Sequence, residues 1–341
     1  MKVLLIGGTG TISTAITQLA PAYGFEVYLL NRGNRRNRVP EGVKVIEADI
    51  YQEAEVKEKL KDLTFDVVAE FIAYDVEALE RDVRLFAGKT KQFIFISSAS
   101  AYQKPLSSPY ITESTPLYNP FWQYSRNKIA CEEYLMKEYR EHGFPITIVR
   151  PSHTYGDYEL PLAVHGRKGS FSVLNRMLQG KKVIVHGDGS SLWTLTHNTD
   201  FAKAFIGLMG NIHAIGEAFQ ITSDESLTWN QIYEIIGSAL GVTPKIVHIP
   251  SETLAKVYPE LVGGLLGDKT HTVIFDNSKV KRVVPDYSAT IRFDQGVRRA
   301  LANILSDQEL QRPDPEFDQW TDRMIAVYEE MESSLPRMGQ L

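Results

Sequence analysis

A tyrosine and a lysine stand four residues apart in the segment 124–128, which reads YSRNK. In a helix this spacing puts Tyr124 and Lys128 on one face. A tyrosine with an unperturbed pKa of about 10 is a poor base at neutral pH, but a nearby ammonium group favours its phenolate. The pair is therefore suited to general acid/base work on a hydroxyl or carbonyl group. Tyrosine and lysine at this spacing are also common on helix surfaces, so the pair needs support from its surroundings.

Two serines, Ser97 and Ser98, give that support because they directly follow the apolar run 92–96, which predicts a buried strand. Ligands of doubly wound parallel sheets bind at the carboxyl ends of the strands. We therefore expect both hydroxyl groups at the ligand edge of the sheet, upstream of the helix that carries Tyr124 and Lys128.

A glycine turn at the N-terminus predicts where a dinucleotide would bind. The apolar run 3–6 reads as a strand buried on both faces, Gly7, Gly8 and Gly10 follow, and a helical pattern begins at Thr11. A strand that turns on glycines into a helix presents backbone N–H groups and the positive end of the helix dipole at one point. That arrangement suits a pyrophosphate.

The end of the next strand, residues 25–30, bears on the choice of cofactor. An acidic residue at this place accepts a hydrogen bond from a ribose 2′-hydroxyl group, whereas an arginine accommodates a 2′-phosphate. This chain has Asn31 and Arg32 there. We expect both to contact the cofactor, with NADP favoured over NAD.

Alternating strands and helices define the fold class. Strands are predicted at 43–50, 65–73, 92–96 and 145–150, with Glu70 as the odd residue of its strand, and helices at 53–63, 76–86 and 124–142. This pattern predicts an α/β fold, a Rossmann-type doubly wound parallel sheet with a smaller mixed α/β substrate domain. The predicted division is 1–165 for the NAD(P)-binding domain, to which a segment near 190–215 returns, and 166–341 for the substrate-binding domain.

Composition excludes several classes of protein. A net charge of -5 and a pI of about 6.0 argue against a general binder of nucleic acid or of membrane surfaces. The single cysteine, Cys131, excludes an internal disulfide, and the histidines lack metal-ligand spacing, so no metal is expected. The first apolar run is too short for a signal peptide, and no stretch approaches a membrane span. We expect a cytoplasmic enzyme with a small-molecule substrate.

Five motifs in order carry a resemblance to a known family. They are GGTGTIS at the N-terminus, Asp49-Ile50, FIFISSASAY, YSRNK and RPSHTYG, followed by GDGSSLWTLTHNTD. The chain resembles the extended short-chain dehydrogenase/reductase superfamily, in particular the NAD(P)-dependent epimerase/dehydratase group typified by UDP-galactose 4-epimerase.

The resemblance implies roles for individual residues. Ser98 would hydrogen-bond the substrate oxygen, Tyr124 would be the proton donor and acceptor, and Lys128 would orient the nicotinamide ribose and lower the pKa of the tyrosine. Besides Tyr124, Lys128, Asn31 and Arg32, the implied cofactor contacts are Gly7, Gly10, Thr11 and Ile12 at the pyrophosphate, Asp49 and Ile50 at the adenine, Phe71 and Ala73 along the channel, Ser97, and Pro151 near the nicotinamide amide.

The sequence also departs from the family pattern. Ser13 replaces the third glycine of the loop, and Ala99 and Ser100 replace the Asp-Glu pair of dehydratases, which disfavours sugar 4,6-dehydration. Trp193 stands where the family often has an arginine, and His153 where many epimerases have asparagine. With Ser100 as a weaker alternative to Ser98, these residues are candidate substrate contacts, and a substrate other than a standard nucleotide sugar is compatible with them.

Two hypotheses about function follow. The first is an NAD(P)-dependent epimerase or reductase acting on a sugar, a nucleotide sugar or a similar molecule, and the sequence does not separate these two activities. The alternative is a catalytically silent Rossmann-fold protein that binds RNA or regulates. The resemblance also implies a homodimer built on the helices 76–86 and 124–142. Their outward faces are expected to carry Leu79, Val83, Ile129 and Leu135, which is compatible with a homodimer and equally with packing within one chain.

Overall fold

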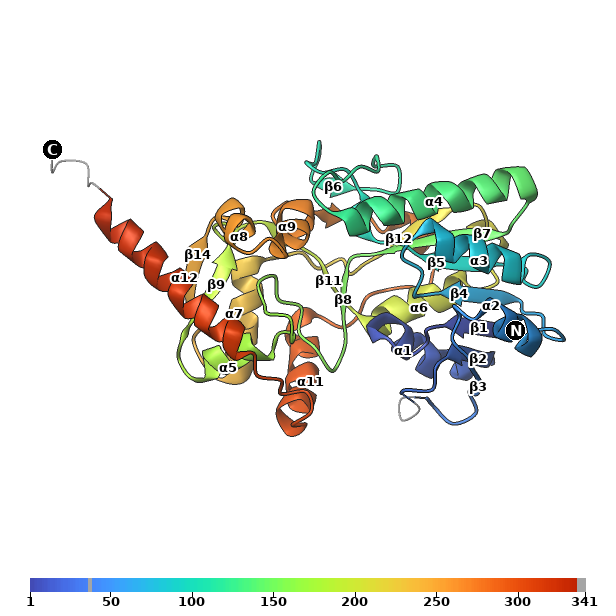
Figure 1. Cartoon of the computed structure of the whole chain (residues 1–341), viewed down its shortest axis with the longest axis horizontal. Coiled ribbons are helices and arrows are strands. Elements are labelled where there is room, and N and C mark those ends of the chain that lie inside the picture. Colours follow the sequence, from blue (N-terminus) through green and yellow to red (C-terminus); the bar gives the residue numbers. More distant parts are fainter. Residues whose placement is uncertain (36–38, 336–341) are drawn as a thin grey trace. The chain divides into compact units, whose positions relative to one another are not determined.

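A single parallel sheet organises the first part of the chain. The computed structural model describes residues 1–35 and 39–335, so Arg36, Arg38 and the C-terminal residues 336–341 lie outside it. Within the described residues, seven strands pair in the order β3-β2-β1-β4-β5-β7-β12 (Figure 1). Their bounds are β1 Lys2–Ile6, β2 Glu26–Asn31, β3 Lys44–Glu47, β4 Val67–Glu70, β5 Phe93–Ile96, β7 Ile146–Pro151 and β12 Ala218–Ile221.

All of these pairings are parallel, and the chain order reverses between β1 and β4. This reversal is the topological switch point at which doubly wound sheets bind their ligands. The predicted Rossmann-type fold is confirmed.

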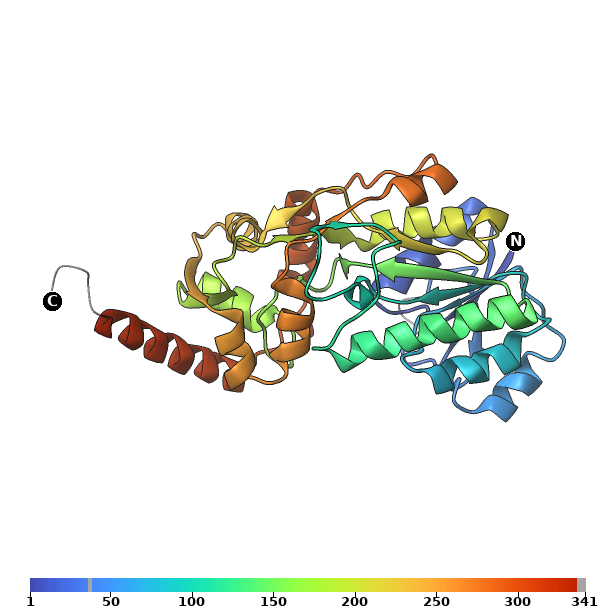
Figure 2. The same cartoon turned by 90° about the horizontal axis from the view of Figure 1, so that it is seen from above.

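Helices cover both faces of the sheet because the strands are apolar on both sides (Figures 1 and 2). Val3 and Leu5 of β1 pack in one core with α1 (Thr11–Leu19) and α6 (Asn198–Leu208). Leu4 and Ile6 point the other way and pack with α2 (Glu53–Lys59), α3 (Val76–Phe86) and α4 (Gln123–His142).

The predicted outward faces of α3 and α4 need a correction. Leu79 of α3 and Leu135 of α4 are both fully buried in this second core, where they pack against the sheet. Val83 is partly buried against the same core. These leucines therefore stabilise the fold of one chain and are not available to a dimer interface. The homodimer stays a prediction without them.

The chain divides into two compact units, each described by itself here. The first comprises Met1–Gly156, Thr194–Glu225 and Val273–Ile291. Its first segment ends at Gly156, before residue 165. The unit also includes Val273–Ile291, which the predicted division assigned to the substrate-binding domain. The reason is hydrogen bonding: Gln220 Nε2 on β12 donates to the carbonyl oxygens of Ile111 (3.0 Å) and Asp276 (2.7 Å). Its further elements are β6 Tyr110–Ile111, β8 His153–Tyr155, β11 Leu195–His197, β15 Ile274–Phe275 and α10 Ser278–Val283, with short 3-10 turns at Ala20–Tyr23, Ala99–Ala101 and Ile212–Ala214.

The second unit comprises Asp157–Trp193, Ser226–Thr272 and Arg292–Leu341. Its core includes Trp193 stacked on Trp229, with ring centroids 5.9 Å apart, and the buried Arg176, which donates to Asp322 at 2.5 Å. Its elements are α5 Phe171–Leu178, β9 Lys182–His186, β10 Leu192–Trp193, β13 Leu227–Thr228, α7 Trp229–Leu240, β14 Lys245–Ile249, α8 Ser251–Val257, α9 Leu261–Gly264, a π-helical turn Leu265–Lys269, α11 Phe293–Ser306 and α12 Pro315–Ser334.

Two predicted strands end earlier than expected, because polar side chains bind the backbone beyond them. The strand predicted at 65–73 ends at Glu70, whose carboxyl group accepts from the N–H groups of Ile72 and Ala73. The strand predicted at 43–50 ends at Glu47, and Asp49 Oδ1 then accepts from Tyr51 N–H at 3.1 Å. Both ends create turns at the carboxyl edge of the sheet.

No helix within the described ranges, 1–35 and 39–335, is long and apolar enough to cross a membrane.

Candidate functional site

The glycine turn after β1 is packed tightly on its inner side. Gly7 has φ +82°, and a Cβ atom there would lie 2.4 Å from Ile72 Cγ2. A Cβ atom on Gly8 would lie 2.4 Å from Leu29 Cδ2. Both glycines are therefore required by backbone conformation or close packing, whether or not a ligand binds.

On the outer side of the turn, Ser13 binds the backbone of Gly7 and Gly10 by hydrogen bonds. Ser13 Oγ donates to the carbonyl oxygen of Gly7 at 2.8 Å and accepts from Gly10 N–H at 2.9 Å. The serine at the third glycine position thus closes the turn with hydrogen bonds. Among the described residues, a Cβ atom on Gly10 would meet only Ser13 Oγ, at 3.4 Å, so the part of the chain that the structure describes leaves the space above Gly10 open. The first N–H groups of α1, from Thr11 and Ile12, have no partner within the helix and suit a pyrophosphate at this opening.

The end of β2 carries both signs of charge. Asn31 Oδ1 accepts from Gly33 N–H at 2.9 Å, Arg32 is exposed, and Arg35 donates to the carbonyl oxygen of Thr9 in the glycine turn at 3.2 Å. Glu47 ends β3, where it is in register with Asn31 of β2, and its carboxylate lies against Gly33, where an added Cβ atom would lie 2.9 Å from Glu47 Cδ. This carboxylate was not predicted, because it reaches the end of β2 from the neighbouring strand β3.

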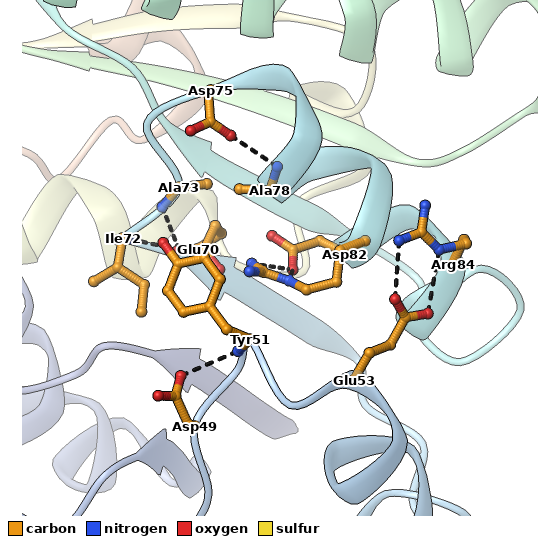
Figure 3. A network of polar contacts seen from close by, with 11 residues as sticks. Asp49, Tyr51, Glu53, Glu70, Ile72, Ala73, Asp75, Ala78, Asp82 and Arg84 are labelled. Carbon is orange, nitrogen blue, oxygen red and sulfur yellow. Dashed lines mark hydrogen bonds and ion pairs between the residues drawn. The ribbon is translucent and has the colours of Figure 1, made fainter.

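The remaining predicted cofactor contacts lie along the same edge of the sheet. Ile50 is 3% exposed, Ala73 is buried, and the ring of Phe71 packs 5.6 Å from that of Phe205 of α6. Pro151 ends β7 and pairs in register with Ile221 of β12. Asp49 holds the turn that precedes α2 (Figure 3).

Lys128 is buried, at 1% exposure, and is hydrogen-bonded to the turn after β4 and to the end of β5. Its Nζ donates to the carbonyl oxygens of Ala73 and Ile96, each at 2.8 Å, and lies 4.6 Å from the Phe95 ring centroid. Burial lowers the pKa of this lysine to about 8, partly offset by nearby acidic groups. An ammonium group has three N–H donors. Two are used by these carbonyl groups, which leaves one for a ligand hydroxyl group.

Tyr124 lies one helical turn before Lys128 and is partly exposed. The Lys128 ammonium group lies 5.8 Å from the centre of its ring, while the rings of Trp122 and Tyr74 lie 5.0 and 6.2 Å away. The aromatic neighbours hold the phenol ring on the side where Lys128 is buried.

Three hydroxyl groups form a chain beside β5. Ser125 Oγ of α4 donates to Ser100 Oγ at 2.8 Å, and Ser100 Oγ lies 2.8 Å from Ser98 Oγ. Ser98 Oγ also accepts from Ser100 N–H at 3.2 Å. Ser100 is buried, whereas Ser98 is partly exposed at the end of the chain. When Ser100 donates to Ser98, the hydroxyl proton of Ser98 is left for a substrate oxygen.

Ser97 has a structural partner instead of an open hydroxyl group. Its Oγ donates to Glu132 Oε1 at 2.5 Å, and the same carboxylate receives Arg150 Nη2 at 2.6 Å. Glu132 and Arg150 are both buried, and Arg150 also lies 4.9 Å from the Tyr102 ring. The Glu132 carboxylate raises the pKa of Arg150 against the effect of burial. This network was not predicted; a glutamate on the inward face of the predicted helix was the signal for it.

The candidate substrate residues belong to two different units of the chain. His153 begins β8, which pairs with β11 in the first unit. Trp193 belongs to the second unit, is 2% exposed and stacks on Trp229. Its indole Nε1 is buried without a hydrogen-bond partner among the described residues. Within the described residues, no group of three or more histidine, cysteine or acidic side chains could hold a metal ion.

The chain matches the sequence model of one family and is similar to known proteins in sequence and in fold. Residues 3–222 match the sequence model of the NAD dependent epimerase/dehydratase family. The chain is 25% identical over 295 residues to the 2'-dehydrokanamycin reductase of Streptomyces kanamyceticus, covering 84% of this chain and 80% of that relative. It is 26% identical over 261 residues to the chloroplast stem-loop binding protein of 41 kDa b of Arabidopsis thaliana, and the match covers 72% of this chain and 65% of that relative. Among solved structures, the dTDP-glucose 4,6-dehydratase of Bacillus anthracis in complex with NAD superposes with a TM-score of 0.72 at 19% identity, covering 91% and 98%.

Proposed function

Because the chain belongs to the NAD dependent epimerase/dehydratase family, we propose that it is an NAD(P)-dependent epimerase or reductase. Its substrate would be a sugar, a nucleotide sugar or a similar small molecule with a reactive hydroxyl or carbonyl group. The observation that carries this proposal is the buried Lys128, which is hydrogen-bonded to the turn after β4 and to the end of β5 and lies one helical turn from Tyr124. The open glycine turn at α1 fits the pyrophosphate of the dinucleotide.

The proposed chemistry divides between three side chains. Lys128 keeps an ammonium group near Tyr124 at neutral pH and offers its third N–H to the ribose of the cofactor. Tyr124 takes the proton from the substrate hydroxyl group, or returns it to the carbonyl oxygen. Ser98 donates to the same oxygen, oriented by Ser100 and Ser125. A nicotinamide dinucleotide bound at the glycine turn would supply the hydride transfer.

The choice between NAD and NADP depends on two opposing side chains at the end of β2. Arg32 offers a positive charge to a 2′-phosphate, and Glu47 brings a carboxylate to the same strand end. We retain a preference for NADP because Arg32 and Arg35 together place two cations there.

The residues that follow Ser98 bear on which reaction we propose. Ala99 and Ser100 are both buried and carry no carboxyl group, whereas the resemblance leads us to expect an Asp-Glu pair at these positions in a 4,6-dehydratase. We therefore favour epimerisation or reduction, although a compared structure is a dehydratase. Ser100, His153 and Trp193 stay candidate substrate contacts, and the homodimer and the cytoplasmic location stay predictions.

A catalytically silent protein that binds RNA is the alternative, and one observation favours it. A relative at 26% identity is a chloroplast stem-loop binding protein. The net charge of -5 and the intact Ser98, Tyr124 and Lys128 weigh against this function.

A thermal-shift measurement with NAD⁺, NADH, NADP⁺ and NADPH tests the proposal first. A ligand at about 100 times its Kd stabilises the native state by about 2.7 kcal/mol, which a melting curve resolves. Tyr124→Phe should then abolish turnover of a substrate found by screening while the dinucleotide shift stays. If folded, cofactor-free protein responds to none of the four dinucleotides, the enzyme proposal fails and RNA binding at graded salt becomes the measurement to make.

A further inference from the structure

The ammonium group of Lys128 lies among three aromatic rings. Its Nζ is 4.6 Å from the ring centroid of Phe95, 4.8 Å from that of Tyr74 and 5.8 Å from that of Tyr124. A cation within about 6 Å of an aromatic face is attracted by the ring, and more strongly where water is excluded. Lys128 is only 1% exposed. The three rings thus favour a charge that burial by itself disfavours.

No carboxylate contacts this ammonium group to balance its charge. The titratable groups that face Lys128 are Glu70 on β4, Cys131 and Glu132 on α4, and the phenol groups of Tyr74 and Tyr124. Glu70 Oε1 binds the backbone of its own turn, and the Glu132 carboxylate binds Ser97 and Arg150. Among the described residues, neither acid forms an ion pair with Lys128. Its direct partners are therefore the rings and the two carbonyl oxygens.

Tyr74 differs from the other two rings because it is half exposed, at 51%, and belongs to the turn after β4. Hydrogen bonds fix this turn on both sides of Tyr74 (Figure 3). Before it, Ala73 N–H donates to Glu70 Oε1 at 2.8 Å. After it, Asp75 Oδ1 accepts from Ala78 N–H at 2.9 Å, at the start of α3. Burial and the nearby Glu70 raise the pKa of the Tyr74 phenol, so the ring stays neutral beside the cation.

We propose that Tyr74 is a positioning residue whose ring holds the Lys128 ammonium group charged and in place beside Tyr124. The rings of Tyr74 and Tyr124 lie 6.2 Å apart, centroid to centroid, and both lie within 6 Å of the cation. Ala73, whose carbonyl oxygen accepts from Lys128 Nζ, directly precedes Tyr74. One turn thus supplies both a hydrogen-bond acceptor and an aromatic face. The effect of Tyr74 on ligand binding rests on the proposed function, whereas its effect on the charge of Lys128 does not.

The charge on Lys128 can be measured through stability. Burial lowers the pKa of this lysine to about 8, whereas a lysine in the unfolded chain titrates at about 10.4. Between these pH values the unfolded chain holds a proton that the folded chain has lost. Stability therefore rises with pH relative to a protein with Lys128→Met, and the pH at which the rise begins reports the protonation of folded Lys128.

Two substitutions of Tyr74 separate the ring from its bulk. Leucine still excludes water but has no aromatic face. In Tyr74→Leu, compared with the same protein carrying Lys128→Met, the rise should begin about 0.5 to 1 pH unit lower than in wild type. Tyr74→Phe keeps the ring and should begin its rise where wild type does. Tyr23→Leu removes a tyrosine of similar exposure, 57%, from the turn before β2, and as the matched control it should also follow wild type.

The direction of the change distinguishes a lost ring from a loosened turn. If leucine at this position only lets water reach Lys128, the pKa of the lysine returns toward its ordinary value and the rise begins at a higher pH. The proposal is therefore overturned by a rise in Tyr74→Leu that begins at the wild-type pH or above it. It is equally overturned if Tyr74→Phe behaves like Tyr74→Leu.

Titration with NADH and NADPH gives a second measurement that needs no substitution of Lys128. In wild type the affinity should fall between pH 8 and 10, as the ammonium group is lost. In Tyr74→Leu the fall should begin about 0.5 to 1 pH unit lower, while Tyr74→Phe follows wild type. Equal profiles for wild type and Tyr74→Leu would contradict the proposal. Wild type that binds neither dinucleotide, with the unfolding difference present, would refute the proposed function alone.

Discussion

Lys128 Nζ and the carbonyl oxygen of Ala73 lie 2.8 Å apart, which joins the middle of α4 to the turn after β4 across 55 positions of sequence. The same ammonium group binds Ile96 at the end of β5. Lys128, which the sequence predicts to be part of a catalytic pair, thus also connects the turn after β4 to the end of β5 by hydrogen bonds. Its replacement should affect both stability and ligand binding.

The first prediction concerns the charge on Lys128. Burial lowers its pKa to about 8, so above that pH the folded chain has lost a proton that unfolded lysine keeps to about pH 10.4. Unfolding then takes up a proton, and wild-type stability should rise with pH by up to about 1.4 kcal/mol per unit relative to Lys128→Met. Urea unfolding of both proteins from pH 8 to 10 measures this. Dinucleotide affinity should fall over the same range in wild type.

The second prediction separates fold from ligand at the glycine turn. Gly7→Ala should destabilise the protein by several kcal/mol, because it combines φ +82° with a 2.4 Å approach to Ile72. Gly10→Ala should leave stability within about 0.5 kcal/mol, yet weaken dinucleotide binding by filling the open space. Chemical unfolding and dinucleotide titration of both variants measure the two effects. A Gly10→Ala protein with wild-type dinucleotide affinity would place the pyrophosphate elsewhere.

The third prediction concerns the buried ion pair behind Ser97. Glu132→Ala leaves the Arg150 guanidinium group buried without its carboxylate and should reduce the free energy of unfolding by about 3–5 kcal/mol. Ser97→Ala removes one hydrogen bond to that carboxylate and should reduce it by about 1.5–3 kcal/mol. Urea unfolding ranks the two variants. The opposite ranking would mean that Arg150 finds another anionic partner.

The fourth prediction concerns cofactor selection. Arg32→Ala should weaken NADPH more than NADH, because it removes a cation from the 2′-phosphate position. Glu47→Gln should weaken NADH more, if its carboxylate accepts from the ribose 2′-hydroxyl group. Fluorescence titration of the two reduced dinucleotides measures both ratios. An equal loss of both dinucleotides in Arg32→Ala would show that this arginine does not read the 2′-phosphate.

Much of the fold was predictable because it is encoded over short stretches of sequence. Neighbouring residues were enough to predict several elements. The apolar runs predicted the strands β1 and β5, the glycines at 7, 8 and 10 predicted a turn, and the YSRNK segment predicted a helix. Their alternation was enough to predict a doubly wound parallel sheet and, with it, the edge at which ligands bind. The extents of β3 and β4 were overestimated, because Asp49 and Glu70 end them through side-chain hydrogen bonds to the backbone.

By itself, the sequence determined that Tyr124 and Lys128 share a helix face, that Ser97 and Ser98 follow a strand, and that a glycine turn opens α1. The partner of Ser97, which is Glu132, the inward direction of Leu79 and Leu135, and the binding of Glu70 to the turn after β4 became known from the tertiary structure alone. The two groups differ in how far apart in the sequence the interacting residues lie. Periodicity acts between residues one or two turns apart, whereas a buried polar group takes whichever partner the packing of distant elements places beside it.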